Sequence, residues 1–140
     1  MRSSQRTIGV ALFAIAMGLV GSRGLQAEDA LKNGTIITRT DLVSAKGMEG
    51  VLVLRDLPPG AESGKHTQSE DEIVYILDGS VMVEVQGKAP VTLKAGEAFH
   101  TAAGQVHNVK NASATAPGKA LAFYIVKKGT PLEGISKPAN

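Results

Sequence analysis

Residues 60–79 read GAESGKHTQSEDEIVYILDG, and this stretch decides the fold expected of the chain. It opens at Gly60, passes through His66 and Gln68, reaches Glu72, and closes at Gly79. His66 and Gln68 are two residues apart, so on an extended segment both side chains face the same side. The terminal Asp-Gly dipeptide predicts a hairpin turn. The pattern therefore indicates polar side chains presented from one face of a β-rich segment.

A second stretch, GEAFHTAAGQVHNVKN at residues 96–111, has the same organisation. The turn glycines Gly96 and Gly104 precede His107, and alternating residues of a strand follow. Because inward side chains of different strands can meet inside a β-barrel, we expect His66, Gln68, Glu72 and His107 to converge.

The chain after residue 34 reads as strands alone. Short runs rich in β-branched residues alternate with turn residues at the spacing typical of sandwiches and barrels. The predicted strands are residues 35–40, 50–57, 72–77, 81–86, 91–93, 98–101, 107–110 and 120–127. Alternation along them predicts an apolar interior suited to hydrophobic small molecules, lined by Val53, Val74, Ile76, Val83 and Phe123.

The N-terminal segment has the features of a secretory signal peptide. Arg2 and Arg6 precede an apolar run at residues 8–20, and Ala27 offers a small residue at a cleavage point. The run is short for a membrane span, so we expect a secreted or periplasmic protein with no stable membrane insertion after cleavage; an uncleaved anchor is the alternative. The predicted organisation is a signal peptide (1–27), an arm with the first strand (28–49), one barrel domain (50–128) and a C-terminal tail (129–140).

Composition excludes several classes of function. The 140 residues carry a net charge of +2, and the basic excess lies in the signal segment, so nothing indicates a nucleic-acid partner. The chain has no cysteine, which rules out thiolate nucleophiles, disulfides and iron–sulfur clusters. Tryptophan is absent and aromatic residues make up 4% of the chain, so stacking platforms for bases or sugars are not expected.

The four converging residues predict a metal site. Two imidazoles and one carboxylate, from His66, His107 and Glu72, suit a divalent transition metal such as Fe, Mn, Ni, Cu or Zn and leave open positions. Gln68 supplies a weak neutral oxygen donor, or orients a metal-bound water or the substrate. Taken singly, each residue has an ordinary alternative: a lone histidine in a strand is usually a surface or core residue, and Glu72 lies in an acidic cluster.

With these two motifs the chain resembles a small single-domain cupin of the type 2 conserved-barrel kind. The first cupin motif is glycine, five residues, His-x-His, three or four residues, glutamate, six residues, glycine. Residues 60–79 match every spacing, with Gln68 in place of the second histidine. The second motif, glycine, five residues, Pro-x-Gly, two residues, histidine, three residues, asparagine, matches residues 96–111, with Ala102 in place of the proline. The resemblance implies an all-β fold, a double-stranded β-helix or jelly-roll barrel.

The resemblance also implies function. It favours a metal-dependent oxidoreductase of the dioxygenase type acting on a small organic substrate, with Glu72 and Gln68 as catalytic residues. The alternatives are a non-catalytic barrel that binds or senses a small ligand, and a metal-dependent isomerase or lyase. Small cupins commonly pair, so a homodimer is expected.

The remaining polar residues near the motifs have simpler interpretations. His100 is interpreted as a surface or interface histidine, with a general-base or supporting role in the pocket as the alternative. Asn111 is expected to cap a turn. Tyr75 should face away from the site because its parity is opposite to that of Glu72.

Overall fold

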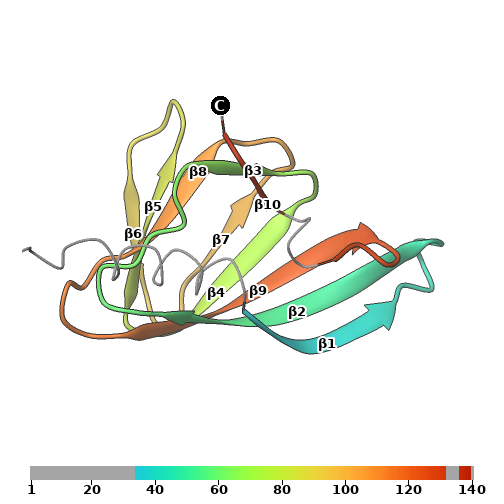
Figure 1. Ribbon diagram of the computed structural model, residues 1–140, viewed down its shortest axis with the longest axis horizontal. Coiled ribbons are helices and arrows are strands. Elements are labelled where there is room, and N and C mark those ends of the chain that lie inside the picture. The colour runs from blue at the N-terminus through green and yellow to red at the C-terminus, as the bar shows by residue number, and fades with distance from the viewer. Residues whose placement is uncertain (1–33, 132–135, 140) are drawn as a thin grey trace, which may run out of the picture.

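The computed structural model describes residues 34–131 and 136–139, and the predicted signal peptide at residues 1–27 lies outside them. Two five-stranded antiparallel sheets face each other, as Figure 1 shows, so the all-β prediction is confirmed. In sheet order, the first contains β1 (Thr35–Asp41), β2 (Met48–Leu57), β9 (Gly118–Lys127), β4 (Glu72–Asp78) and β7 (Ala98–Thr101). The second contains β10 (Ser136–Pro138), β3 (His66–Gln68), β8 (His107–Asn111), β5 (Ser80–Val85) and β6 (Val91–Lys94).

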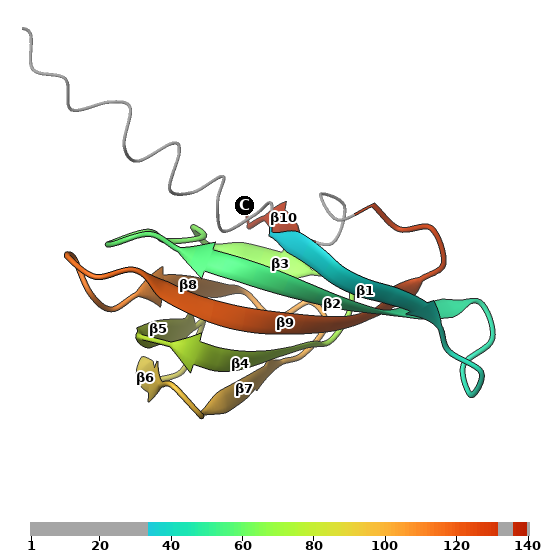
Figure 2. The same cartoon turned by 90° about the horizontal axis from the view of Figure 1, so that it is seen from below.

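The strands β2 and β9 form the longest pairing of the first sheet. They lie side by side from Met48 opposite Lys127 to Leu57 opposite Gly118 (Figure 2). Burial alternates along β9 and along β2 from Val51 onward, because successive side chains of a strand point to opposite sides. Strand β4 pairs with the other edge of β9, so this pairing fixes which residues of β4 face inward.

The apolar core lies between the two sheets. It is built mainly from buried alanine and β-branched side chains, together with Leu57 and Tyr124: Val51, Val53, Leu57, Ala61, Val74, Ile76, Val81, Val83, Ala120, Ala122, Tyr124 and Val126. Four of the five predicted wall residues are among them. Within the described residues, no helix has the length and apolar character of a membrane span.

Phe123, the fifth predicted wall residue, is on the opposite face of β9, so that prediction is wrong. It pairs with Leu52 and with Ile73, which is half exposed on the outer side of the sheet. Its ring covers Gly50, where a Cβ atom would come within 3.3 Å of the ring. The parity of β9 instead turns its neighbour Tyr124 inward.

The Asp78-Gly79 turn does not close a hairpin, contrary to the sequence prediction. The strands on either side of it, β4 and β5, belong to different sheets, so the turn carries the chain from one sheet to the other. Gly79 has a φ of +78° and lies against Gly118, where an added Cβ would come within 3.1 Å of the Gly118 Cα. Glycine is needed here for both its backbone conformation and the close approach.

The outer face of the first sheet is also apolar. Ile73, Tyr75, Leu77 and Ile125 are each between 42% and 50% exposed there. Tyr75 faces away from the interior, as its parity predicted. Strand β4 therefore carries apolar side chains on both faces.

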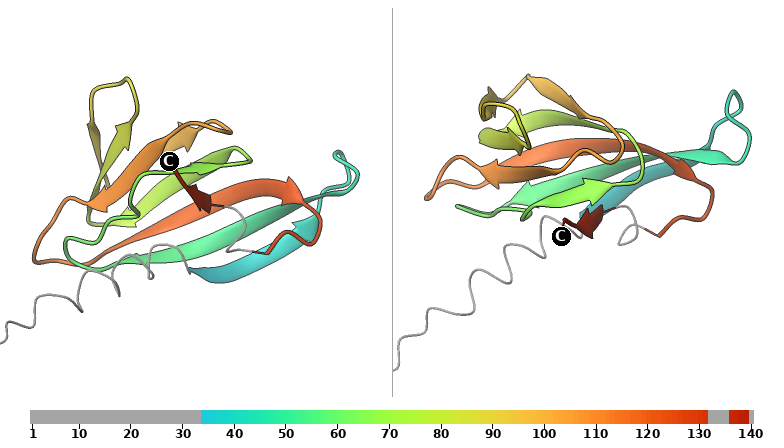
Figure 3. Two further views of the ribbon diagram at one scale, coloured as in Figure 1. Left: turned by 45° about the horizontal axis from the view of Figure 1, so that its top comes forward. Right: turned by 90° about the horizontal axis from the view of Figure 1, so that it is seen from above.

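Part of the C-terminal tail is a strand. Ser136–Pro138 pairs antiparallel with His66–Gln68, so β10 adds to the edge of the second sheet beside β3 (Figure 3). Neither of these three-residue strands was predicted, because three residues carry no period.

Asn111 ties together the loops at the end of β8. Its buried amide group donates to the carbonyl oxygens of Leu57, Pro58 and Ala116, and its Oδ1 accepts from the Ser113 amide. This is the turn-capping role expected from the sequence.

Replacing Asn111 with Ala should destabilise the fold by about 2–3 kcal/mol, because buried carbonyl groups lose their donor. Urea denaturation followed by circular dichroism measures this loss. Ser113→Ala is the control, since its hydroxyl bonds only the exposed amides of Thr115 and Ala116. Equal losses in the two variants would contradict the role assigned to Asn111.

Candidate functional site

Strand β3 presents two of the predicted site residues to the interior. His66 and Gln68 are 8% and 3% exposed, while Thr67 between them is less buried. The prediction that both side chains share one face is confirmed. The strand lies between β8 and β10, which fixes its orientation through backbone pairing.

His107 lies directly opposite His66. It is the first residue of β8, its Cα is the pairing partner of His66, and the two ring centroids are 4.2 Å apart. The ring planes are inclined by 54°. The two glycine-started motifs therefore meet at their histidines.

Glu72 lies next to these histidines at the start of β4. Its Oε2 accepts a hydrogen bond from Gln68 Nε2 at 2.8 Å and lies 3.7 Å from His107 Nε2. Its Oε1 accepts a hydrogen bond from the Tyr124 hydroxyl at 2.5 Å. The structure thus brings together all four predicted residues, and it holds the Glu72 carboxylate between two donors.

Backbone carbonyls set the tautomer of both imidazoles. His66 Nδ1 is 2.9 Å from the Gly64 carbonyl oxygen, and His107 Nδ1 is 2.9 Å from the Gln105 carbonyl oxygen. A carbonyl can only accept, so each Nδ1 carries a proton, and in the neutral ring Nε2 then keeps its lone pair. Burial lowers the pKa of His66, which favours its neutral form.

The charges around Glu72 favour an ionised carboxylate and a protonated phenol. Burial alone would raise the pKa of Glu72, but nearby His107 and the donors Tyr124 and Gln68 outweigh it and hold that pKa below its ordinary value. Burial, followed by the charge of Glu72, raises the pKa of Tyr124. Tyr124 therefore stays a hydrogen-bond donor to Glu72.

Arg55 and Tyr124 are two further members of this cluster that the sequence motifs do not indicate. Arg55 Nη2 donates to the Tyr124 hydroxyl at 3.0 Å, so a chain of hydrogen bonds runs from Arg55 through Tyr124 and Glu72 to Gln68. The signal was available in residues 50–57, where Arg55 has the same parity as Val51 and Val53. A basic residue at an inward position of a strand is rarely buried without a partner.

Four buried polar atoms have no hydrogen-bond partner among the described residues. They are Arg55 Nη1, Gln68 Oε1, Thr101 Oγ1 and His107 Nε2. Thr101 lies opposite Glu72 in the pairing of β4 with β7, so all four residues belong to one region of the interior. Buried polar atoms are normally satisfied, so this concentration makes the region the candidate functional site.

The donor set meets part of the requirements of a metal ion. In residues 34–131 and 136–139, no group of three or more His, Cys, Asp or Glu side chains is arranged as a metal site. His107 Nε2 and Glu72 Oε2 are nevertheless 3.7 Å apart, and two donors that bind one ion at about 2.1 Å each lie at most about 4.2 Å apart. His107 Nε2 and Gln68 Oε1 are buried without a hydrogen-bond partner among the described residues. The separation of His107 Nε2 and Glu72 Oε2 is compatible with both atoms binding one ion.

His100 lies outside the cluster. Its side chain is 56% exposed on β7, and Nε2 is 2.8 Å from an Asp71 carboxylate oxygen. The surface interpretation is therefore confirmed.

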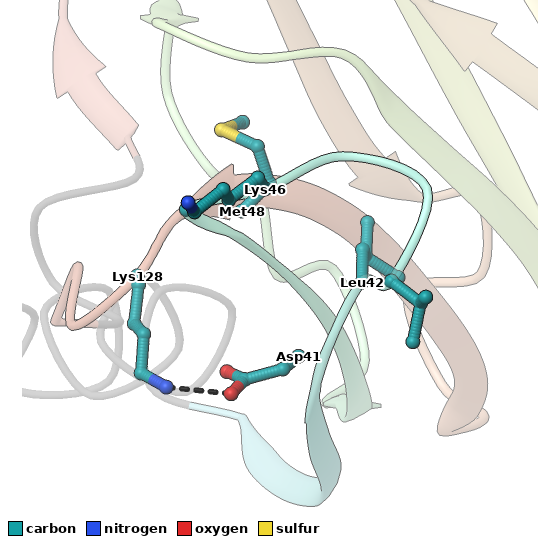
Figure 4. Close-up of a pocket in the computed structure, with 7 residues that line it drawn as sticks. Asp41, Leu42, Lys46, Met48 and Lys128 are labelled. Atoms are coloured by element: carbon teal, nitrogen blue, oxygen red, sulfur yellow. Dashed lines mark hydrogen bonds and ion pairs between the residues drawn. The ribbon is translucent and has the colours of Figure 1, made fainter.

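A separate pocket of about 370 Å³ lies at the turn between β1 and β2 (Figure 4). It is lined by Asp41, Leu42, Val43, Lys46, Gly47, Met48 and Lys128. Asp41 and Lys128 pair with each other at 2.6 Å, and no residue of the histidine cluster lines the pocket. The chemistry of the predicted residues is therefore not located there.

Comparison with known proteins agrees with this architecture. A family model described as "cupin domain" matches residues 53–129. A double-stranded β-helix protein from Klebsiella pneumoniae superposes with a TM-score of 0.58 at 17% identity, over 77% of this chain and 84% of that one. The DMSP lyase DddQ from Ruegeria pomeroyi superposes with a TM-score of 0.50 at 22% identity, over 62% of this chain and 42% of that one. At these identities the structures show the fold alone.

A curated relative is more similar in sequence. The β-alanine degradation protein BauB of Pseudomonas aeruginosa is 45% identical over 58 residues, which is 40% of this chain. The match spans 61% of that protein's length.

Tyr124→Phe should lower the free energy of unfolding by about 2 kcal/mol or more, because it removes a buried donor to Glu72 and the acceptor of Arg55. Urea denaturation measures the change. Tyr75→Phe is the matched control: its hydroxyl is on the exposed outer face, so a change below about 0.5 kcal/mol is expected. A loss in Tyr124→Phe no larger than in the control would show that the chain of hydrogen bonds is not formed.

Proposed function

The chain belongs to the cupin domain family, and from this premise we propose that it is a metal-dependent enzyme acting on a small organic substrate, with a dioxygenase-type oxidoreductase as the leading reaction class. The observation that carries the proposal is the pair of buried imidazoles, His66 and His107, whose ring centroids are 4.2 Å apart and whose Nδ1 atoms are each held by a backbone carbonyl. Such a fixed tautomer is the usual arrangement of metal-ligating histidines.

In this proposal four side chains hold a divalent transition metal: Fe, Mn, Ni, Cu or Zn. His66 and His107 are the principal ligands, Glu72 adds a negative oxygen, and the Gln68 amide oxygen is a weaker donor. When bound, the metal supplies a Lewis acid with open positions for substrate and oxygen.

The protein's own residues have defined tasks around that centre. Gln68 Oε1, which has no partner among the described residues, is placed to accept a hydrogen bond from a substrate or a bound water. Tyr124 keeps Glu72 ionised and in position by donating to Oε1. The small β-branched core surrounding the cluster excludes bulk water and strengthens its electrostatic interactions.

A specific observation supports a second candidate. Both oxygens of Glu72 are engaged, one by Tyr124 and one by Gln68, so the carboxylate is not free to act as a base while these bonds persist. This favours a barrel that binds a ligand, or Lewis-acid chemistry of the isomerase or lyase type. The partial match to a β-alanine degradation protein is compatible with any of these, since it supports only a small organic substrate.

Export and pairing complete the proposal. The signal-peptide pattern at residues 1–27 supports a secreted or periplasmic location, and the apolar outer face of the first sheet supports a homodimer.

Elemental analysis of the purified protein tests the metal centre. We expect near-stoichiometric Fe, Mn, Ni, Cu or Zn in the wild type and none in the His66→Ala/His107→Ala double variant, because the two principal ligands are gone. His100→Ala is the matched control and should keep its metal, since His100 is a surface residue paired with Asp71. A folded wild type without metal would overturn the metal-dependent function and leave the ligand-binding barrel.

Oxygen consumption separates the reaction classes. With a dioxygenase-type enzyme, the metal-loaded protein should consume oxygen with a member of a panel of diphenols, flavonols and dicarbonyls, and the double variant should not. Turnover that persists with Zn(II) under anaerobic conditions would instead identify an isomerase or lyase, because Zn(II) does not change its oxidation state.

A further inference from the structure

The guanidinium group of Arg55 is buried in the interior. The residue is 8% exposed and shares the inward face of β2 with Val51, Val53 and Leu57. Burying a cation among apolar side chains is costly unless hydrogen bonds and opposite charge compensate. The partners of Arg55 therefore indicate whether its charge is compensated within the protein or by a bound ligand.

Within the described residues, this compensation is incomplete. Nη2 donates to the Tyr124 hydroxyl at 3.0 Å, and Nη1 has no partner. Tyr124 is a neutral phenol that donates a hydrogen bond to Glu72, so Tyr124 lies between the guanidinium of Arg55 and the negative charge of Glu72. No described carboxylate lies within ion-pair distance of Arg55.

The side chains close to Arg55 in the sheet are small. Ala120 is its direct partner on β9, and Ala122 is the next inward residue of that strand. Methyl groups leave the guanidinium less covered than leucine or isoleucine would. Hydrogen bonds link Arg55 through Tyr124 and Glu72 to Gln68. The other two residues with an unpartnered atom are neighbours of Glu72: Thr101 is its pairing partner on β7, and His107 Nε2 is 3.7 Å from its carboxylate.

We propose that the interior site binds a small molecule through a carboxylate group, with Arg55 Nη1 donating to a carboxylate oxygen and the remainder of the molecule directed toward Gln68 and His107. Guanidinium is the side-chain group best suited to carboxylate, because it is always charged and its donors are fixed in a plane. A carboxylate adds one negative charge beside Glu72, whereas a phosphate adds nearly two, so the carboxylate is the less repelled anion.

The proposed carboxylate names the substrate class of the proposed function. It rests on that function only for the part of the ligand directed toward Gln68 and His107. Arg55 is not a metal ligand, so its part can be tested without metal. Calorimetric titration compares propanoate with propanamide, two probes of nearly equal shape that differ in charge. Each is titrated into the full chain, both as purified and after treatment with a chelator.

We expect propanoate to bind at least about tenfold more tightly than propanamide in both preparations, because the amide oxygen can still accept from Arg55 but carries no negative charge to pair with the guanidinium. Arg55→Met should abolish this preference, and Arg55→Lys should reduce it by keeping the charge without the planar donors. Arg39→Met is the matched control and should keep the preference, since Arg39 is on β1 and pairs with Glu49.

Three results would overturn the inference. They are a folded wild type without preference for propanoate, an undiminished preference in folded Arg55→Met, and tighter binding of inorganic phosphate than of propanoate. If circular dichroism shows that Arg55→Met does not fold, the wild-type comparison and Arg55→Lys decide the question.

The two proposals fail separately. Arg55-dependent binding of propanoate by a protein that holds no metal would retain the carboxylate site and refute the metal-dependent function. A metal-loaded protein with no preference for propanoate would refute the carboxylate site alone.

Discussion

The buried carboxylate of Glu72 is the charge on which the interior depends. It lies between a phenol and an amide, within reach of an imidazole, and the phenol links it to the buried guanidinium of Arg55. An unpaired charge in this position would be strongly destabilising. The two opposite charges therefore have to be placed together, and the strands that carry them cannot shift independently. The arrangement of the polar site and the register of the strands therefore depend on each other.

Strand pairing places these polar groups beside one another. Tyr124 on β9 is the direct partner of Glu72 on β4 and of Val51 on β2, so the ladder alone places the phenol beside the carboxylate. The same is true of the second sheet, where His66 is paired with His107. Rigid strands, and not mobile loops, thus position these groups. This explains how a small domain without disulfides can hold several polar side chains in fixed orientations.

Much of this was predictable from the sequence, and the failures have physical causes. Period-two alternation and turn glycines gave the all-β class, eight strands and the shared face of His66 and Gln68. The hairpin at Gly79 failed because a local turn signal does not tell which sheet the next strand joins. Residues 120–127 are apolar on both faces, so the sequence alone does not show which face is inward. For this reason it predicts Phe123 inward, wrongly, and does not mark Tyr124 as a residue of the site. Arg55 has the same parity as Val51 and Val53, which indicates that it faces inward, but no motif draws attention to it.

The two-faced character of β4 has a consequence for how the chain folds. A slip of one residue would turn Ile73, Tyr75 and Leu77 to the interior and carry Glu72 to the surface. Hydrophobic burial scarcely opposes that error, since the outer residues are as apolar as the inner ones. The slipped state would, however, leave Arg55 inside without the charge of Glu72. The charge pairing in the interior therefore disfavours the wrong register of β4, which hydrophobic burial alone would allow.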